Sequence, residues 1–128
     1  MPPKKKPSIL ILDRDVSLAH ILAERFRAEG WTTRVAKTIE HAKKFLARKA
    51  SDVLLVDPEH EADAQSALSA WMTSASDGVT YVIIHTATLT REAQMFWKRS
   101  GASGILKKGE RSLTDLVKKV KKYGTHTT

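Results

Sequence analysis

The stretch Asp52-Val53-Leu54-Leu55-Val56-Asp57 decides the fold of this chain. Its four consecutive apolar residues are typical of a strand buried on both faces, as in a parallel sheet. Pro58 would end this strand, because proline lacks a backbone donor. Ligands of open α/β sheets bind outside the carboxyl ends of the strands, which makes Asp57 a candidate functional residue. The alternative is that Asp57-Pro58 is only a turn that ends the strand.

Strand patterns and helix patterns alternate five times along the chain. A second apolar run, Ile9 to Leu12, ends at Asp13, and shorter strands are expected at 31–36, 79–85 and 104–106. Amphipathic helices are expected between the strands and after the last one, at about 39–49 and 91–100 and around residues 18–26, 64–71 and 113–120. The alternation predicts an α/β, doubly wound (βα)5 flavodoxin-like fold with a five-stranded parallel sheet in the order 2-1-3-4-5.

This strand order brings polar residues from four strand ends together. Asp13 and Asp57 would end neighbouring strands, and Thr86 and the pair Lys107-Lys108 would end the next two. Carboxylates suit a hard cation such as Mg²⁺, and a carboxylate can also act as a nucleophile toward a phosphoryl group. A hydroxyl and an ammonium group suit phosphoryl oxygens. The arrangement predicts phosphoryl transfer onto Asp57 with assistance from Mg²⁺.

Length and composition indicate one globular domain. The chain has 128 residues, of which 41% are hydrophobic and none is cysteine, so disulfides and thiol chemistry are excluded. No apolar run approaches the roughly 20 residues of a membrane span, and the N-terminus lacks the apolar core of a signal peptide. We therefore expect a cytoplasmic protein that does not insert into membranes, with a basic flexible tail at 1–7, a domain at 8–124 and a short tail at 125–128.

The net charge of +8 is confined to two segments. Lys4, Lys5 and Lys6 supply +3, residues 107–128 supply +5, and the stretch between them sums to zero. A solubilising tail and a solvated helix face are favoured over nucleic-acid binding through the basic last helix, because only Tyr123 adds an aromatic side chain there.

The order and spacing of several short segments resemble the receiver domains of two-component response regulators, over roughly Ser8 to Tyr123. The segments that carry this resemblance are Ile9–Asp13, Gly30-Trp31, Asp52–Asp57, His85–Ala87 and Gly101–Lys108. The resemblance implies that Asp57 is the phospho-acceptor and Asp13 the first residue of an acidic pair. It also implies that Thr86 senses the phosphoryl group, that Lys108 contacts it, and that the backbone carbonyl of Glu59 is a metal ligand.

The metal site departs from the family pattern. The second acid of the pair is Arg14 here. Opposite charges in contact attract by about 4 kcal/mol at an effective dielectric of 20, so we expect the guanidinium to pair with Asp13 or Asp57 and to substitute for the metal. Asp15 is either a replacement ligand or, as we favour, the cap of the following helix. Binding of Mg²⁺ is therefore in doubt.

Further departures lie toward the C-terminus. Gly109 follows Lys108 where the family has a proline, and Ile105 replaces the family's switch aromatic. Phe96 and Trp97 are adjacent and cannot both enter one narrow apolar stripe, so one of them is expected at the surface, as a partner anchor or as part of a repacked core. His85 is expected to point away from Thr86, as a partly buried histidine.

Two functional hypotheses follow. In the first, the chain is a phosphorylatable receiver in a phosphorelay, with a histidine kinase or phosphotransfer protein as donor and no enzymatic activity beyond self-phosphorylation of Asp57. In the second, it is a pseudo-receiver that serves as a protein-interaction module without phosphorylation. Both predict a protein partner or a homodimer through the face formed by helix 91–100, strand 104–106 and the last helix, including Phe96 and Trp97.

Overall fold

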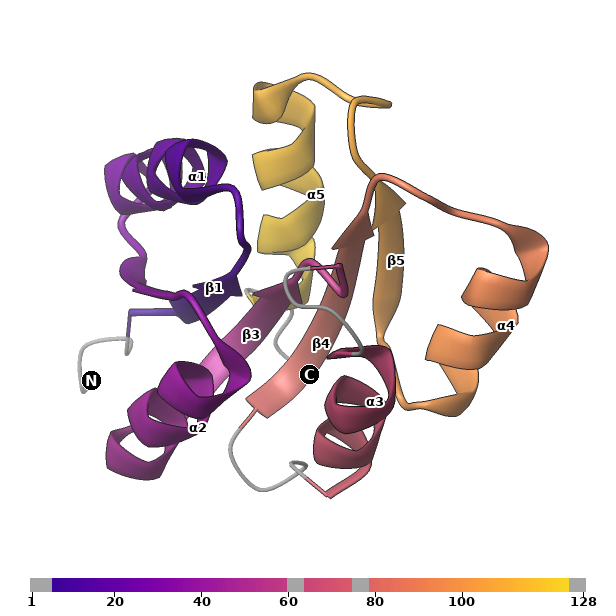
Figure 1. Ribbon diagram of the computed structural model, residues 1–128. Coiled ribbons are helices and arrows are strands. Elements are labelled where there is room, and N and C mark those ends of the chain that lie inside the picture. Colours follow the sequence, from indigo (N-terminus) through magenta and orange to yellow (C-terminus); the bar gives the residue numbers. More distant parts are fainter. Residues whose placement is uncertain (1–5, 60–63, 75–78, 125–128) are drawn as a thin grey trace.

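The computed structural model describes residues 6–59, 64–74 and 79–124, so most of both expected tails (1–5 and 125–128) lies outside the described residues. Within these segments strands and helices alternate, as Figure 1 shows. Their bounds are β1 (Ser8–Leu12), α1 (Val16–Ala28), β2 (Thr32–Ala36), α2 (Ile39–Arg48), β3 (Ser51–Val56), α3 (Ala64–Ser74), β4 (Val79–Thr86), α4 (Arg91–Arg99), β5 (Gly104–Lys107) and α5 (Leu113–Gly124). The described strands form one parallel sheet in the order β2-β1-β3-β4-β5, which confirms the predicted topology.

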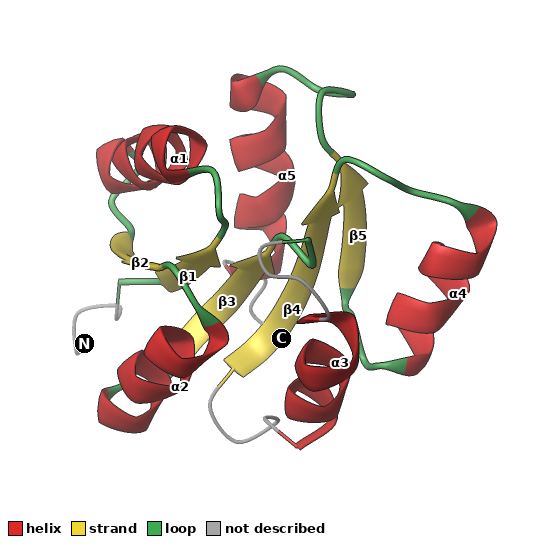
Figure 2. Ribbon diagram, viewed as in Figure 1, coloured by secondary structure: helices red, strands yellow, loops and turns green. Residues whose placement is uncertain are grey.

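The two all-apolar strands lie at the centre of the sheet and are buried on both faces. Residues 9–12 of β1 and 53–56 of β3 are at most 2% exposed. Alternate side chains of these strands enter two separate cores. Ile9 and Ile11 pack with α1 and α5, whereas Leu10 and Leu12 pack with α2, α3 and α4. Figure 2 shows the helices on the two sides of the sheet. A continuous apolar run is what this double burial requires.

Side-chain caps begin four of the helices. The Asp15 carboxylate accepts a hydrogen bond from the Leu18 amide at 3.1 Å, which confirms the cap predicted for α1. Thr38, Thr90 and Ser112 accept in the same way from the third residue after each of them. These caps fix where the chain turns from each strand end into the following helix.

A hydrogen-bonded clasp joins the amino ends of β1 and β3. Asp52 Oδ2 accepts from the backbone amide of Ser8 at 2.7 Å and from its hydroxyl at 3.2 Å. The Ser8 hydroxyl in turn accepts from the Asp52 amide at 3.1 Å. At the other end of the pair, Leu12 lies opposite Val56, and the Asp57 amide donates to the Leu12 carbonyl at 2.8 Å. The register therefore places Asp13 and Asp57 side by side.

The adjacent aromatics of α4 have different environments. Trp97 is 2% exposed and packs in the core beside Ala102 and Ile105, whereas Phe96 is 38% exposed. Their ring centroids are 4.8 Å apart in an edge-to-face arrangement. The expectation that one of the two rings is exposed is confirmed, but Trp97 cannot serve as a surface anchor because it fills the core.

In the described part of the chain, no helix combines the length and the apolar character needed to cross a membrane.

Candidate functional site

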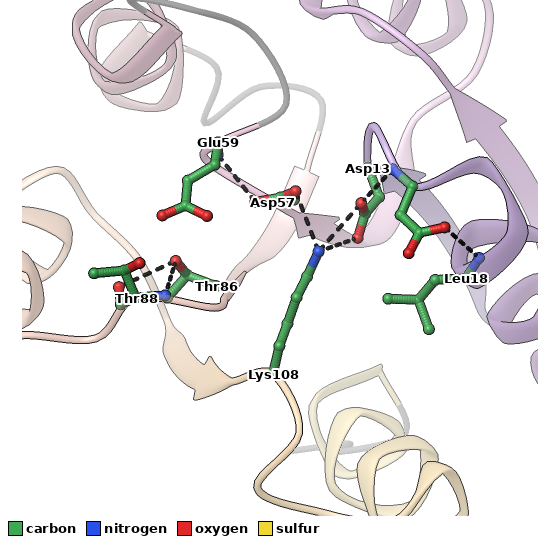
Figure 3. Close-up of polar contacts among 8 residues, drawn as sticks. Asp13, Leu18, Asp57, Glu59, Thr86, Thr88 and Lys108 are labelled. Atoms are coloured by element: carbon green, nitrogen blue, oxygen red, sulfur yellow. Dashed lines mark hydrogen bonds and ion pairs between the residues drawn. The ribbon is translucent and has the colours of Figure 1, made fainter.

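Three strands deliver charged side chains to one point at the carboxyl edge of the sheet. The Lys108 ammonium lies 3.0 Å from Asp13 Oδ2 and 3.2 Å from Asp57 Oδ2 (Figure 3). Asp13 and Asp57 are 3% and 2% exposed, and the Lys108 side chain is 19% exposed. Of the pair Lys107-Lys108, it is Lys108 that points into the cluster, whereas Lys107 is exposed.

Backbone amides hold the other oxygens of the two carboxylates. The Asp15 amide donates to Asp13 Oδ1 at 2.9 Å, and the Glu59 amide donates to Asp57 Oδ1 at 2.9 Å. Each bond runs from the residue two positions later in the chain, so the loop after each strand folds back over its own carboxylate. These bonds fix the orientation of both carboxylates before any ligand arrives.

The electrostatics of the cluster are dominated by burial. Burial raises the pKa of Asp13 above its usual value, although the Asp15 amide and Lys108 act in the opposite direction. Burial alone would lower the pKa of Lys108, but the carboxylates of Asp13 and Asp57 outweigh it and raise that pKa. Lys108 is therefore held as a cation between the two acids, and it compensates the charge that burial disfavours.

Arg14 does not enter the cluster, and this corrects the expectation that it pairs with Asp13 or Asp57. Its side chain is exposed, and within the described segments it forms neither a hydrogen bond nor an ion pair. The physical reason is that Lys108, reaching in from β5, already satisfies both carboxylates. A guanidinium that remains in water avoids desolvation.

The side chains present do not fit a divalent metal site. Among the described residues, no group of three or more His, Asp or Glu side chains is placed to hold a metal ion. Asp13 and Asp57 contact an ammonium, the second acidic position is Arg14, and the Asp15 carboxylate caps α1. Mg²⁺ would require several oxygen ligands in near-octahedral geometry. We therefore derive no chemical step through a metal in this arrangement.

Thr86 lies at the end of β4, and its hydroxyl is turned into the following loop. The hydroxyl donates to the Thr88 carbonyl at 3.1 Å and accepts from the Thr88 amide at 3.2 Å (Figure 3). Thr86 is 1% exposed. The residue is thus at the predicted edge of the sheet, but its hydroxyl bonds to its own loop and not to the acidic cluster.

The turn after β5 sets the position of Lys108. The Lys108 amide donates to the Thr86 carbonyl at 2.7 Å, which extends the pairing of β4 and β5 by one residue. Gly109 follows with φ +81°, in the left-handed region that favours glycine. The chain turns at this glycine, directly after the residue whose ammonium enters the cluster.

A cleft of about 320 Å³ is lined by the loop after β3, by the end of β4 and by α4. Its lining includes Glu59, Thr86, Thr90, Ala93 and Phe96. The cleft thus adjoins the loop that follows Asp57, whereas Asp57 itself is buried. Sequence reasoning had no means of finding this cleft, because its walls come from four separate segments.

The fold is similar to that of solved response regulators. A response regulator from Thermotoga maritima is similar at a TM-score of 0.81 and 20% identity, over 95% of this chain and 100% of that one. The chemotaxis protein CheY4 from Vibrio cholerae is similar at a TM-score of 0.81 and 18% identity, over 93% of this chain and 99% of that one. A response regulator protein from Burkholderia pseudomallei was solved with a phosphorylated aspartic acid, calcium ion and citrate. It is similar at a TM-score of 0.76 and 17% identity, over 94% of this chain and 67% of that one.

The comparisons define the fold. Neither a protein-family model nor a curated protein matches the sequence. The structural likeness covers nearly the whole chain, and the chain therefore has the CheY-like fold of response regulator receiver domains.

Proposed function

We propose that residues 8–124 act as a receiver domain in phosphorelay signal transduction, with Asp57 at the phospho-acceptor position. We propose further that Mg²⁺-dependent phosphorylation of Asp57 is weak, because a lysine of the chain occupies the place between the carboxylates that a metal would need. The chain would have no enzymatic activity of its own beyond self-phosphorylation of Asp57.

The contact of Lys108 with both Asp13 and Asp57 carries this proposal. A metal that entered between the two acids would have to displace an ammonium held by two carboxylates. Arg14 would add a second positive charge, on an exposed side chain at the residue next to Asp13. Both effects lower the affinity for a divalent cation. The cleft lined by Glu59 and Thr86 would admit a phosphodonor next to the loop that follows Asp57.

Acetyl phosphate labelling, followed by intact mass, tests the proposal. With Mg²⁺ present, we expect a small fraction of the chain to gain one phosphoryl group and Asp57→Asn to gain none. Asp15→Asn is the matched control, since that carboxylate caps α1 and lies outside the proposed acceptor role. Labelling of the wild type to near completion would contradict the weak-site proposal. Labelling that persists in Asp57→Asn would contradict the assignment of Asp57.

The alternative is a pseudo-receiver that works by protein contacts alone. It is favoured by the same closed cluster, in which Lys108 neutralises the acids without phosphorylation. In either case, a histidine kinase, a phosphotransfer protein or another protein partner would meet the face of α4, β5 and α5. The exposed apolar side chains there are Met95 and Phe96, at 48% and 38%. Complete absence of labelling under all conditions would select the pseudo-receiver.

A further inference from the structure

A second cavity, of about 230 Å³, is lined by Lys108 and by residues of α1, β4, β5 and α5, and shares no lining residue with the cleft beside α4. Its apolar wall comes from Leu18 of α1 and from Leu113 and Leu116 of α5. The imidazole of His85 and the β5–α5 turn complete it. The receiver chemistry proposed for Asp57 does not use this cavity.

A buried polar group without a partner lines the cavity. His85 is 4% exposed, and its Nδ1 is buried and has no hydrogen-bond partner. Such atoms are uncommon in folded proteins and are usually satisfied by a ligand or a water molecule. Burial lowers the pKa of His85 to about 4, so the ring is neutral at pH 7 and one of its nitrogens can donate a hydrogen bond. His85 is therefore a neutral wall residue, one of whose ring nitrogens has no partner in the described part of the chain.

The rim of the cavity is positively charged. Lys107 and Arg111 both line it, and both side chains are exposed. Neither forms an ion pair or a hydrogen bond with any residue in the described segments. Lys108 also lines the cavity, but the carboxylates of Asp13 and Asp57 hold its ammonium. Two cations without a partner among the described residues thus lie beside an apolar wall and the buried imidazole of His85.

We propose that this cavity is a binding site for a small organic anion with an apolar body, of the aromatic monocarboxylate class. The ring of the ligand would pack against Leu18, Leu113 and Leu116. Its carboxylate would meet Arg111, which can bind it through two parallel hydrogen bonds, and Lys107. An inorganic anion would leave the apolar wall in contact with water, and a neutral apolar molecule would leave the two cations without a partner.

The first test is a titration of the full chain with benzoate, monitored by amide nitrogen–proton correlation spectra without Mg²⁺ or a phosphodonor. We expect saturable shifts that concentrate at residues 85 and 107–116. Benzamide, which has the same shape without the charge, should bind at least about fivefold more weakly. Absence of saturable shifts, or equal affinity for benzamide, would overturn the proposal. Because no phosphorylation is involved, the result is independent of whether Asp57 is an acceptor.

The second test removes the rim charges. The double variant Lys107→Gln/Arg111→Gln should weaken benzoate binding about tenfold. Lys118→Gln/Lys122→Gln is the matched control, since it removes the same charge from exposed positions on α5 that do not line the cavity. Equal weakening in the two variants would mean that only the net charge attracts benzoate, and it would overturn the site. Thermal unfolding of each variant establishes that the variants are folded.

Discussion

The ammonium of Lys108 lies 3.0 Å from the nearer carboxylate oxygen of Asp13, a residue 95 positions earlier in the chain. This ion pair, together with the contact of Lys108 with Asp57, ties the carboxyl ends of β1 and β3 to the turn that follows β5. A cation of the chain itself thus neutralises the acidic cluster.

Replacement of Lys108 by methionine should destabilise the fold. The change keeps most of the side-chain length but leaves two buried carboxylates side by side without a cation, and we expect a loss of about 3 kcal/mol in the free energy of unfolding at pH 7. Protonation of one acid relieves the repulsion, so the loss should shrink at pH 5. Urea denaturation measures both values. Lys107→Met, at the exposed neighbour, should change stability by less than about 0.5 kcal/mol; an equal loss there would contradict the role of the ion pairs.

Replacement of Arg14 by aspartate should create divalent-metal binding. The substitution removes a cation from the residue next to Asp13 and would supply a third carboxylate to Asp13 and Asp57. Isothermal titration with MgCl₂ should show binding in Arg14→Asp that is at least about tenfold tighter than in the wild type. Arg14→Ala, which removes the charge without adding a ligand, separates the two effects. Identical isotherms for all three proteins would exclude Arg14 as an obstacle to the metal.

Stability should fall as the pH drops from about 6.5 to 4, because of His85. Burial lowers the pKa of this imidazole from 6.5 to about 4, so the unfolded chain takes up the proton first. The stabilising contribution is complete above pH 6.5 and disappears as the pH falls through 4, a change of roughly 3 kcal/mol. Urea denaturation of the wild type and of His85→Leu, at pH 7 and at pH 4, gives the difference in their free energies of unfolding. The change of this difference with pH is the contribution of His85. A pH-independent difference would refute this account.

Alanine at position 109 should weaken the turn that positions Lys108. Gly109 has φ +81°, where a Cβ atom costs about 1–2 kcal/mol. No atom would clash with the new Cβ, so the cost is purely conformational. Gly109→Asn should lose less stability than Gly109→Ala, because asparagine tolerates this region. Urea denaturation of the two variants gives the comparison, and the reverse order would contradict a backbone origin.

The sequence predicted the fold because its two all-apolar segments have only one consistent environment. A run such as Ile9–Leu12 must be covered on both faces, which requires helices on each side of a central strand. Asp13 and Asp57 then become neighbours through the strand order alone. The inward direction of Lys108 was favoured by the resemblance to receiver domains, whereas the strand pattern alone left Lys107 and Lys108 as alternatives.

Two features could not be predicted from the sequence in this way. They are the direction of the Arg14 side chain and which of Phe96 and Trp97 enters the core. The expectation for Arg14 rested on its attraction to Asp13 and Asp57. That attraction is weaker when another cation already pairs with the two acids. This cation, Lys108, comes from a distant strand, so the Arg14 segment alone does not reveal it. Phe96 and Trp97 are about 100° apart around the helix axis. Which ring enters the core depends on how α4 rotates against Ala102 and Ile105, a property of the assembled layers and not of the helix sequence.

The clasp between Ser8 and Asp52 fixes the register of β1 against β3. It thereby aligns a site about 16 Å away, at the far end of a five-residue strand. A slip of one residue between β1 and β3 would turn Asp13 to the opposite face from Asp57, and the two carboxylates could no longer share a lysine. Asp52, at the start of the segment 52–57, thus helps to set the position of Asp57 at its end relative to Asp13. The alignment of the acidic cluster therefore depends on Asp52, although Asp52 contacts none of the residues in the cluster.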